Sequence, residues 1–533
     1  MSSLASKSPP SLTQHLISLL SVALSSFVLN QLPFTLSARP DSIGNDGDSA
    51  VHVAIQLKLR SPELFPKDIE LNEIYLSSRP AFEFAIHRCV VWISQRITDG
   101  NLLLANILVF WMYHLFFILG CYLLGRFVLQ TWWGGTLFAA ASVSLSLSLS
   151  AWWGMVYGAV IPHDLSLAFT PWFMLGFLRW QSHSRRMVIL FGLLGLAANL
   201  YPLQALYLMI VLLGVLALQR RTSVLCLSTA AFLVGAAPAV WVSAIGTFNR
   251  FTTLSQEDRA IIDQLFALHY GYLLLKRLRS TIGVLVRSPV WFFLGIGGLA
   301  CWMKLERKSL SPTDRLLLVF TVITLVLSLF GLVGGALARP LVTFLFHRAS
   351  AFLYVGGYLF SLWFIMDRWR DGQVLWRVLA VGLLGAIMLN GWQYSSLHAR
   401  LFSVPVLQSS PDFYALAEWA KGHTEVSAHF MVPPKVANGS FFAFRVYAER
   451  GLTTQWAAGE TVLSSPQAAI RYWPMAQDIT PLYEQPTDTD DFVRIAHKYD
   501  ADYIVTNAAT PRQPNLPIAY HDETFTVFLV PPE

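Results

Sequence analysis

Residues 44–68 combine acidic, imidazole and amide side chains directly after the first apolar segment of the chain. Asp46 and Asp48 lie two residues apart, and Asp48, His52 and Gln56 follow at four-residue intervals, which places them on one face of a helix. A carboxylate there can act as a general base toward a hydroxyl group. Two carboxylates with an imidazole can also hold a divalent metal such as Mg²⁺ or Mn²⁺ on a phosphate. The alternative is that Asp48 only caps the helix and its neighbours are solvated.

Cationic side chains that could bind the phosphate of a lipid-linked substrate occur in two places. His347 and Arg348 lie about two turns inside an apolar segment, where a charge is costly and usually faces a bundle interior or a cavity. The alternative for Arg348 is that its side chain extends to the membrane interface. Lys276 and Arg277 belong to a basic amphipathic stretch, which could simply contact anionic headgroups.

A third group, His163 and Asp164, lies in "VIPHDLS", at a turn between two apolar segments. These two residues could join Asp48 in one site if both turns face the same side of the membrane. The alternative is that Asp164 is only a helix cap.

The composition places these residues in a membrane protein. Of the 533 residues, 54% are hydrophobic and only 13% are charged, whereas a soluble protein carries nearer a quarter. The net charge of +6 arises mainly in short loops between apolar runs, so we expect no nucleic-acid partner. The 4 cysteines form no C-x-x-C motif, and the chain has no P-loop, G-x-G-x-x-G or G-x-S-x-G motif. A disulfide framework, a zinc site, nucleotide binding and a serine hydrolase are therefore not expected.

We predict an all-α polytopic membrane bundle of about eleven spanning helices, because about twenty apolar residues are needed to cross roughly 30 Å of hydrocarbon. The expected spans are 12–31, 102–125, 134–160, 165–181, 187–200, 203–219, 223–244, 289–303, 315–337, 341–366 and 374–395. The first is expected to remain as an anchor, because its basic N-terminal region is weak and its apolar core is long. Residues 142–154 alternate like a strand, but an open strand is unfavourable in lipid and a helix is expected.

The basic loops predict the orientation of the bundle. Under these spans they all fall on one side, which the positive-inside rule assigns to the cytoplasm. They contain Arg126, Arg185, Arg186, Arg220, Arg221, Lys304, Arg307, Lys308, Arg368 and Arg370. The N-terminus is then cytoplasmic, and residues 32–101, 245–288 and 396–533 lie outside. Asp46, Asp48 and Asp164 share that outer side.

The chain changes character near residue 405. Residues 410–533 contain 15 Asp plus Glu and 8 Lys plus Arg, a net charge of about −7, whereas the rest of the chain is positive. Helices are expected in "SPDFYALAEWAKGH" and "DDFVRIAHKYD", and strands in "AHFMVPP", "DYIVTN" and "ETFTVFLVPP". The sequence therefore predicts two domains, a membrane domain over 1–404 and a small extracytoplasmic α/β domain over 405–533.

The first outer loop predicts two amphipathic helices. One begins with Asp48 or Ser49 as its N-cap and runs to about Arg60. Its apolar residues Ala50, Val53, Ala54 and Leu57 lie on the face away from His52, so we expect it at the membrane surface. The second is expected from about Pro80 to Ile97.

This layout resembles the GT-C class of integral-membrane glycosyltransferases. The shared features are an acid after the first span, an amphipathic helix in a large first outer loop, about eleven spans and a C-terminal outer domain. "DGDSAVHVAIQLKLRSPELFPKD" is similar to the acid, short helix and "P-x-L-F-P-x-D" turn of a bacterial, uncharacterised branch. "GLLGLAANLYPLQALYLMI" is similar to its helix pair broken at a step such as Tyr201-Pro202. Asp46-Gly47-Asp48 fits the Asp-x-Asp of some members only as three letters, and "AWWGMVYG" lacks the acid of the "WWDYG" motif.

The resemblance implies a sugar donor linked to polyprenyl phosphate, inverting transfer, membrane lipids as surroundings and a location in the bacterial plasma membrane. It implies Asp48 as base or metal-site acid, assisted by Asp46. The donor phosphate would be bound by Arg348, His347, Lys276 and Arg277, and the supporting residues would be His52, Gln56, His163 and Asp164. Two alternatives remain, a transporter or flippase and a non-catalytic relative with the GT-C fold. An enzyme requires Asp48, His52, Asp164 and Arg348 to converge on one cavity open to lipid and to the outer solvent.

Overall fold

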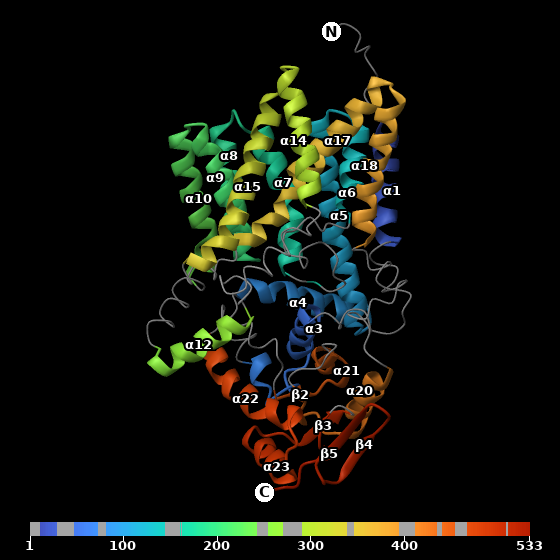
Figure 1. The fold of residues 1–533 in the computed structure, drawn as a ribbon, viewed down its shortest axis with the longest axis vertical. Coiled ribbons are helices and arrows are strands. Elements are labelled where there is room, and N and C mark those ends of the chain that lie inside the picture. The colour runs from blue at the N-terminus through green and yellow to red at the C-terminus, as the bar shows by residue number, and fades with distance from the viewer. Residues whose placement is uncertain are drawn as a thin grey trace.

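The structure is a computed structural model with three tiers. It describes residues 11–28, 47–72, 81–143, 160, 162–241, 254–269, 290–337, 346–393, 411–433, 440–453, 466–507 and 510–533. A bundle of long helices forms one end, a sheet with its own helices forms the other, and α3 (Gly47–Arg60) and α4 (Ala81–Arg96) lie between them (Figure 1). The C-terminus is in the sheet tier (Figure 1).

Every predicted span contains a helix of the bundle. These helices are α1 (Leu12–Ser26), α5 (Leu102–Leu129), α6 (Trp132–Ser142), α7 (Pro162–Arg179), α8 (Ser184–Ala197), α9 (Pro202–Leu218), α10 (Thr222–Val240), α14 (Val290–Glu306), α15 (Pro312–Leu337), α17 (Leu353–Asp371) and α18 (Val374–Gln393). Within the described residues, four helical segments are long and apolar enough to cross a membrane: Leu102–Leu129, Thr222–Val240, Pro312–Gly331 and Phe346–Arg370. The chain is therefore an integral membrane protein, as its composition predicted.

The tenth predicted span differs from a continuous α-helix. Residues 341–345 lie outside the described part, and Phe346–Phe352 form a 3₁₀-helix, η7, that leads into α17. His347 and Arg348 therefore lie on this 3₁₀-helix and not in a regular α-helix. Their predicted depth, about two turns inside the span, depends on residues outside the described part and stays a prediction. Gly331 of α15 makes this packing possible, because a Cβ atom there would come within 2.1 Å of the His347 backbone nitrogen.

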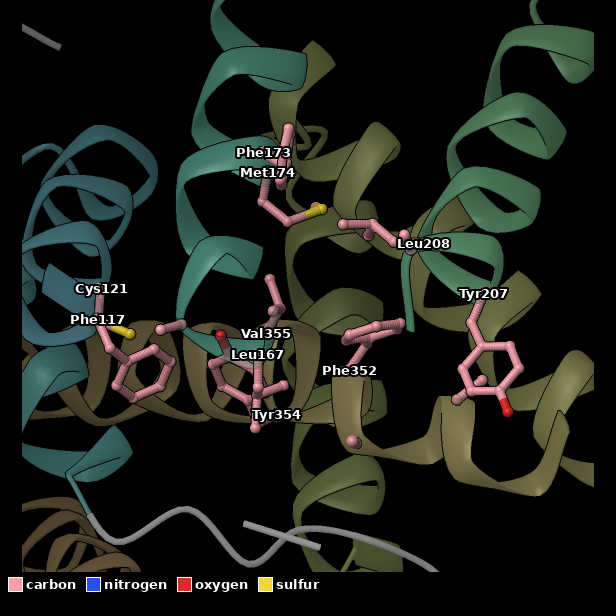
Figure 2. Packing of buried hydrophobic residues seen from close by; sticks show 14 of the residues in the cluster. Phe117, Cys121, Leu167, Phe173, Met174, Tyr207, Leu208, Phe352, Tyr354 and Val355 are labelled. Atoms are coloured by element: carbon pink, nitrogen blue, oxygen red, sulfur yellow. The ribbon is translucent and has the colours of Figure 1, made fainter. Parts of the chain in front are cut away.

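Close contacts between helices hold the centre of the bundle. A Cβ atom at Gly120 of α5 would come within 2.6 Å of Trp172 on α7, so the two helices approach closely at this point. The indole nitrogen of Trp172 donates to the carbonyl oxygen of Phe116 at 3.0 Å. Figure 2 shows Tyr354 of α17 beside Phe117 of α5, and their ring centroids are 6.2 Å apart.

Basic loops pack against one another at one end of the bundle. Arg221, between α9 and α10, donates to the carbonyl oxygen of Gln181, between α7 and α8. Arg307, after α14, pairs with Asp367 of α17 at 3.0 Å. Lys304 and Asp314, which flank the turn between α14 and α15, form a buried pair at 2.7 Å. These contacts bring together loops that the alternation of spans predicted to share one side.

The C-terminal region contains a five-stranded sheet with the order β2-β1-β3-β5-β4. The strands are β1 (His429–Met431), β2 (Gly451–Leu452), β3 (Tyr503–Asn507), β4 (Ile518–His521) and β5 (Phe525–Leu529). β1 pairs in parallel with β2 and β3, and β5 pairs antiparallel with β3, with Tyr503 opposite Leu529, and with β4. Its helices are α20 (Pro411–His423), η9 (Ser440–Ala443), α21 (Phe444–Ala448), α22 (Pro466–Glu484) and α23 (Thr489–Lys498).

The predicted helices and strands of this region are all present, and the elements that we missed have specific reasons. α22 contains Pro474 and Pro481, which normally signal the end of a helix. β2 has two residues, and β4 is an exposed edge strand without an apolar pattern. The boundary near residue 405 lies outside the described residues and stays a prediction.

Between the two tiers, α3 (Gly47–Arg60) and α4 (Ala81–Arg96) have nearly the predicted bounds. α3 includes Gly47, so Asp48 lies within its first turn and is not its N-cap. Residues 50–57 of α3 are all buried, because α21 and η9 of the C-terminal region cover the side turned away from the bundle. The sequence did not predict this cover, whereas the expected position of α3 at the membrane surface stays a prediction. α12 (Gln256–His269) contacts α22 beside this tier.

Candidate functional site

A buried network of uncharged polar groups joins α3 and α4 to the bundle. Nδ1 of His52 lies 3.2 Å from Nε2 of His87, and their rings stack with centroids 5.1 Å apart. Nε2 of Gln56 lies 3.4 Å from Nδ1 of His87. Gln56 and Asn106 of α5 exchange two amide hydrogen bonds of 3.0 and 2.6 Å, and the backbone N–H of Val160 donates to Asn106 at 3.1 Å. We call His52, Gln56, His87 and Asn106 the amide–imidazole network.

The amide groups fix the direction of the bonds in this network. An amide nitrogen can only donate, so Nδ1 of His87 accepts from Gln56. Nε2 of His87 then carries the proton and donates to Nδ1 of His52, which is therefore the acceptor of that pair. Both imidazoles are neutral in this arrangement. The network holds one face of α3 against the first turns of α5.

A second polar group lies deeper, where α7, α9 and η7 meet. Nε2 of His163 and Oδ1 of Asp164 are 2.8 Å apart, and both residues are buried. The centroids of the His163 and Tyr201 rings are 6.0 Å apart. The Tyr201 hydroxyl oxygen lies 3.5 Å from a guanidinium nitrogen of Arg348. His347, next to Arg348, is also buried. We call His163, Asp164, Tyr201 and Arg348 the Asp164–Arg348 chain.

One face of α5 connects the two groups. Asn106 belongs to the amide–imidazole network, and Tyr113 is a buried residue of α5, which packs against α7, the helix that carries Asp164. Seven residues of α-helix span about 10 Å and bring the side chain back to nearly the same face. The two groups are therefore adjacent along α5, although no single contact joins them among the described residues.

The start of α9 adds a region of positive electrostatic potential to the Asp164–Arg348 chain. Tyr201 is the N-cap residue of α9 and Pro202 is its first residue, and no side chain caps this helix. Gln204, at the third position, is 2% exposed, and neither atom of its amide has a hydrogen-bond partner in the described structure. Helical side chains tilt toward the N-terminus, so this amide is directed to the end of α9 that Tyr201 shares with Arg348. The arrangement suits an anion.

Several predicted site residues cannot be placed. Asp46, Lys276 and Arg277 lie outside the described residues, and of Asp48 only the backbone is described. Asp164 is linked to Arg348 through His163 and Tyr201. His52 and Gln56 both contact His87. The structure thus places the two pairs in separate groups, and their convergence with Asp48 on one cavity stays a prediction.

Sequence reasoning missed four residues of the site. His87 and Asn106 each lie more than thirty residues from their partners on α3, and their positions on α4 and α5 gave no reason to single them out. Tyr201 is part of the Tyr-Pro step that the sequence had already marked, and Gln204 lies two residues after that step. A buried polar residue directly after such a break was the available signal.

A metal centre is not evident in the described part of the chain. There, no group of three His, Cys, Asp or Glu side chains lies close enough together to hold a metal ion. The carboxylates of Asp46 and Asp48, which were predicted as ligands, are outside the described side chains.

Comparison with known proteins shows a likeness of fold. No family model matches the sequence, and no curated protein matches it. The crystal structure of the Archaeoglobus fulgidus oligosaccharyltransferase tethered with an acceptor peptide containing the NVT sequon is 13% identical, with a TM-score of 0.52 over 92% of this chain and 69% of that one. The same enzyme in complex with zinc and sulfate gives 13% identity and a TM-score of 0.51, over 92% and 68% of the two chains.

ArnT from Cupriavidus metallidurans bound to undecaprenyl phosphate gives 13% identity and a TM-score of 0.49, over 97% and 98% of the chains. At such identity the two oligosaccharyltransferase structures establish the fold alone. The fold is that of the GT-C class of integral-membrane glycosyltransferases, as the sequence predicted.

Proposed function

We propose that this protein is a glycosyltransferase that moves a sugar from a polyprenyl-phosphate-linked donor to an acceptor at the outer face of the membrane. The observation that carries the proposal is the Asp164–Arg348 chain, which lies beside the uncapped start of α9 and next to the amide–imidazole network. Buried ionisable groups in a membrane bundle are costly and usually functional. The GT-C fold supports a transferase in particular.

The donor phosphate would bind to Arg348 and to the start of α9. Arg348 supplies a permanent positive charge, and the first-turn N–H groups of α9 supply donors. Gln204 can donate a further hydrogen bond from its amide. His347 lies beside Arg348 on η7 and would complete this subsite. Lys276 and Arg277, which precede α14 in the chain, stay as proposed second contacts to the phosphate or to headgroups.

The acceptor would be activated from α3. Asp48 lies one turn before His52 and two turns before Gln56 on this helix. As general base it would accept the proton of the acceptor hydroxyl or amide group while that group attacks the anomeric carbon. The bond from this carbon to the phosphate oxygen breaks, and Arg348 stabilises the phosphate that leaves. Asp46 would assist, and the amide–imidazole network would hold α3 in place.

In the alternative in which Asp48 is a metal-site acid and not the base, a divalent ion such as Mg²⁺ or Mn²⁺ is proposed at Asp46 and Asp48. Carboxylate oxygens suit either ion, which would neutralise charge on the phosphate. Removing divalent ions with EDTA is then expected to abolish transfer, and Mg²⁺ or Mn²⁺ is expected to restore it. Transfer that is unchanged in EDTA would leave Asp48 as a base without metal.

The orientation is also a proposal. The paired basic loops lie at the end of the bundle opposite the C-terminal sheet, which supports a cytoplasmic N-terminus and an extracytoplasmic C-terminal region in a bacterial plasma membrane. Protease added to intact spheroplasts is expected to remove an epitope tag at the C-terminus and to spare one at the N-terminus.

The direct test is transfer in lipid nanodiscs from polyprenyl-phosphate-linked sugars, with the full chain and its variants. Asp48→Asn is expected to lower kcat by at least about 100-fold, because a general base contributes that much. Arg348→Met is expected to weaken donor binding and to raise KM. Asp491→Asn, on the exposed face of α23, is the control. Undiminished transfer by Asp48→Asn would remove the proposed role of this residue.

Mass spectrometry of lipids that co-purify with the protein provides a test without turnover. A polyprenyl-phosphate sugar is expected with the wild-type chain and in reduced amount with Arg348→Met. Equal amounts of this lipid in both preparations would contradict the phosphate subsite.

A further inference from the structure

The segment that follows α3 is tied to the C-terminal region by a buried ion cluster. Nε of Arg445, on α21, donates to Oδ2 of Asp68 at 2.6 Å, and its Nη2 donates to Oδ1 at 3.1 Å. The same Nη2 donates to Oε2 of Glu70 at 2.7 Å. All three side chains are at most 3% exposed. We call Asp68, Glu70 and Arg445 the junction cluster.

Asp68 is the central member of this cluster. Besides Arg445, it accepts hydrogen bonds from the backbone N–H of Leu452 on β2 at 3.1 Å and of Leu71 at 3.0 Å. It therefore joins the segment after α3 to a helix and to a strand of the C-terminal region. Arg445 therefore faces two carboxylates in a buried place, and one guanidinium is shared between them.

A second, more exposed contact lies beside it. Nζ of Lys67 lies 3.1 Å from Asp500 and 3.2 Å from Asp502. Asp502 also accepts from the backbone N–H of His429 at the start of β1, at 2.9 Å. The segment is thus held at the end of the sheet where strands β1 and β3 begin.

The junction is rigidly connected to α3. Nζ of Lys58, in the last turn of α3, donates to the carbonyl oxygen of Leu64 at 2.6 Å. Phe65 is fully buried and has a φ of +57°, a left-handed conformation that a bulky residue adopts only when its surroundings hold it there. Asn72 donates to the carbonyl oxygens of Phe65 and Asp68 at 2.7 and 2.8 Å. Few residues between α3 and Asp68 are free to absorb a movement.

α3 is therefore held from two directions. The amide–imidazole network fixes its polar face to α5, and the junction cluster fixes its C-terminal end to the C-terminal region. We propose that Arg445 and Asp68 are positioning residues, through which the C-terminal region sets the place of α3 relative to the bundle. The catalytic consequence, that they place Asp48 near the donor, rests on the proposed function.

Hydrogen exchange on the full chain in nanodiscs tests the positioning without any assay of activity. Arg445→Met keeps much of the aliphatic length of the side chain and removes its charge. The backbone N–H groups of α3 are expected to exchange at least about 10-fold faster in this variant, because the ionic attachment of α3 to the C-terminal region is lost, although the packing of α21 and η9 on α3 remains. Arg494→Met is the matched control, since Arg494 pairs only with the exposed Asp491 among the contacts described for it, at 2.6 Å.

Asp68→Asn covers the case in which Arg445→Met unfolds the C-terminal region. This substitution breaks the same ion pair from the other side, and Asp68 lies outside the sheet and its helices. Faster exchange in α3 with retained protection of β3 and α23 supports the proposal. Unchanged protection of α3 in Asp68→Asn, or in a folded Arg445→Met, overturns it.

Kinetics then separates this inference from the proposed function. If Asp48 acts from α3, Arg445→Met is expected to lower kcat about 10- to 100-fold and to change the KM for the donor less than about 2-fold, because Arg348 is untouched. Arg445→Lys keeps the charge but loses the two-pronged contact, so partial recovery of kcat is expected. If α3 exchanges faster in Arg445→Met but transfer is unchanged, the proposal that Arg445 and Asp68 position α3 stands, and the catalytic role of Asp48 is refuted.

Discussion

The two attachments of α3 use different chemistry. On the bundle side, the amide–imidazole network is uncharged, and its partners come from α3, α4 and α5, within about fifty residues of one another. On the other side, the junction cluster is built on the ion pair of Asp68 with Arg445, which are 377 residues apart. Neutral groups cost less to bury next to hydrocarbon, whereas an ion pair needs several donors and acceptors to offset its desolvation. The attachment of α3 to the helix bundle is therefore independent of charge, whereas its attachment to the C-terminal region depends on charge.

The largest effect is expected from breaking the charged attachment. Arg445→Met leaves two buried carboxylates without their cation, and such a loss costs about 3–5 kcal/mol. The free energy of opening the junction, measured by hydrogen exchange of the N–H of Leu452, is expected to fall by that amount. A fall as small as that of Arg494→Met would show that the cluster contributes little.

The neutral attachment is expected to be no stronger than the charged one. Asn106→Leu leaves Oε1 of Gln56 and the Val160 N–H without a partner, and at about 1–3 kcal/mol for each group the loss is about 2–6 kcal/mol, a range similar to that of Arg445→Met. The thermal midpoint of the bundle is the measurement, with Asn101→Ala as a control that removes an exposed helix cap of α5. If Asn106→Leu destabilises the protein more than Arg445→Met, the order of the two attachments is reversed.

The two carboxylates of the junction cluster are expected to behave differently with pH. Burial raises the pKa of Glu70, and Arg445 offsets this only in part. Burial also acts to raise the pKa of Asp68, but the guanidinium of Arg445 and the hydrogen bonds hold that pKa below its ordinary value. Asp68 therefore contributes stability at pH above about 4, which is lost as the pH falls, whereas ionising Glu70 removes stability as the pH rises through its raised pKa.

Glu70→Gln is accordingly expected to change the free energy of unfolding by about 1 kcal/mol or less at neutral pH, far less than Asp68→Asn. It is also expected to remove the decline of stability that occurs between the ordinary pKa of a glutamic acid and the raised pKa of Glu70. Thermal midpoints of both variants between pH 4 and 9 are the measurement. Equal losses in the two variants would contradict the assignment of Asp68 as the central member.

The smallest effect is expected at Lys67. Its partners Asp500 and Asp502 are substantially exposed, and exposed pairs contribute at most about 1 kcal/mol. Lys67→Met is expected to leave the protection of α3 nearly unchanged, and hydrogen exchange in 0.5 M salt is expected to give the same result for the wild-type chain. A large loss of α3 protection in Lys67→Met would show that Lys67 belongs to the junction cluster.

Most helices of the membrane bundle could be predicted from the sequence, because the length of an apolar segment determines whether it can span a bilayer. The four-residue spacing of His52 and Gln56 correctly placed them on one face, since this needs only helical geometry. The partners of α3 were not predictable. Arg445 is one of several arginines in an acidic region, and only the folded chain brings it to Asp68. The burial of α3 was missed for the same reason, because its cover comes from distant residues.

The local structure at His347 and Arg348 is another feature that the sequence did not predict. Their apolar surroundings predicted a regular helix, but the approach of η7 to Gly331 depends on the backbone of α15. Similarly, the Tyr201-Pro202 step marked a break, whereas the contact of Tyr201 with Arg348 required the packing of α9 on η7. Local patterns located these positions, and tertiary packing determined their partners.

The seven-residue interval between Asn106 and Tyr113 on α5 has a consequence for how such chains can diverge. One residue inserted between them would turn the two side chains about 100° relative to each other and shift them by about 1.5 Å. The network that holds α3 and the group around Asp164 would then no longer share a face. Relatives that keep this site can therefore change α5 by substitution, whereas a change in its length at this point would separate its two halves.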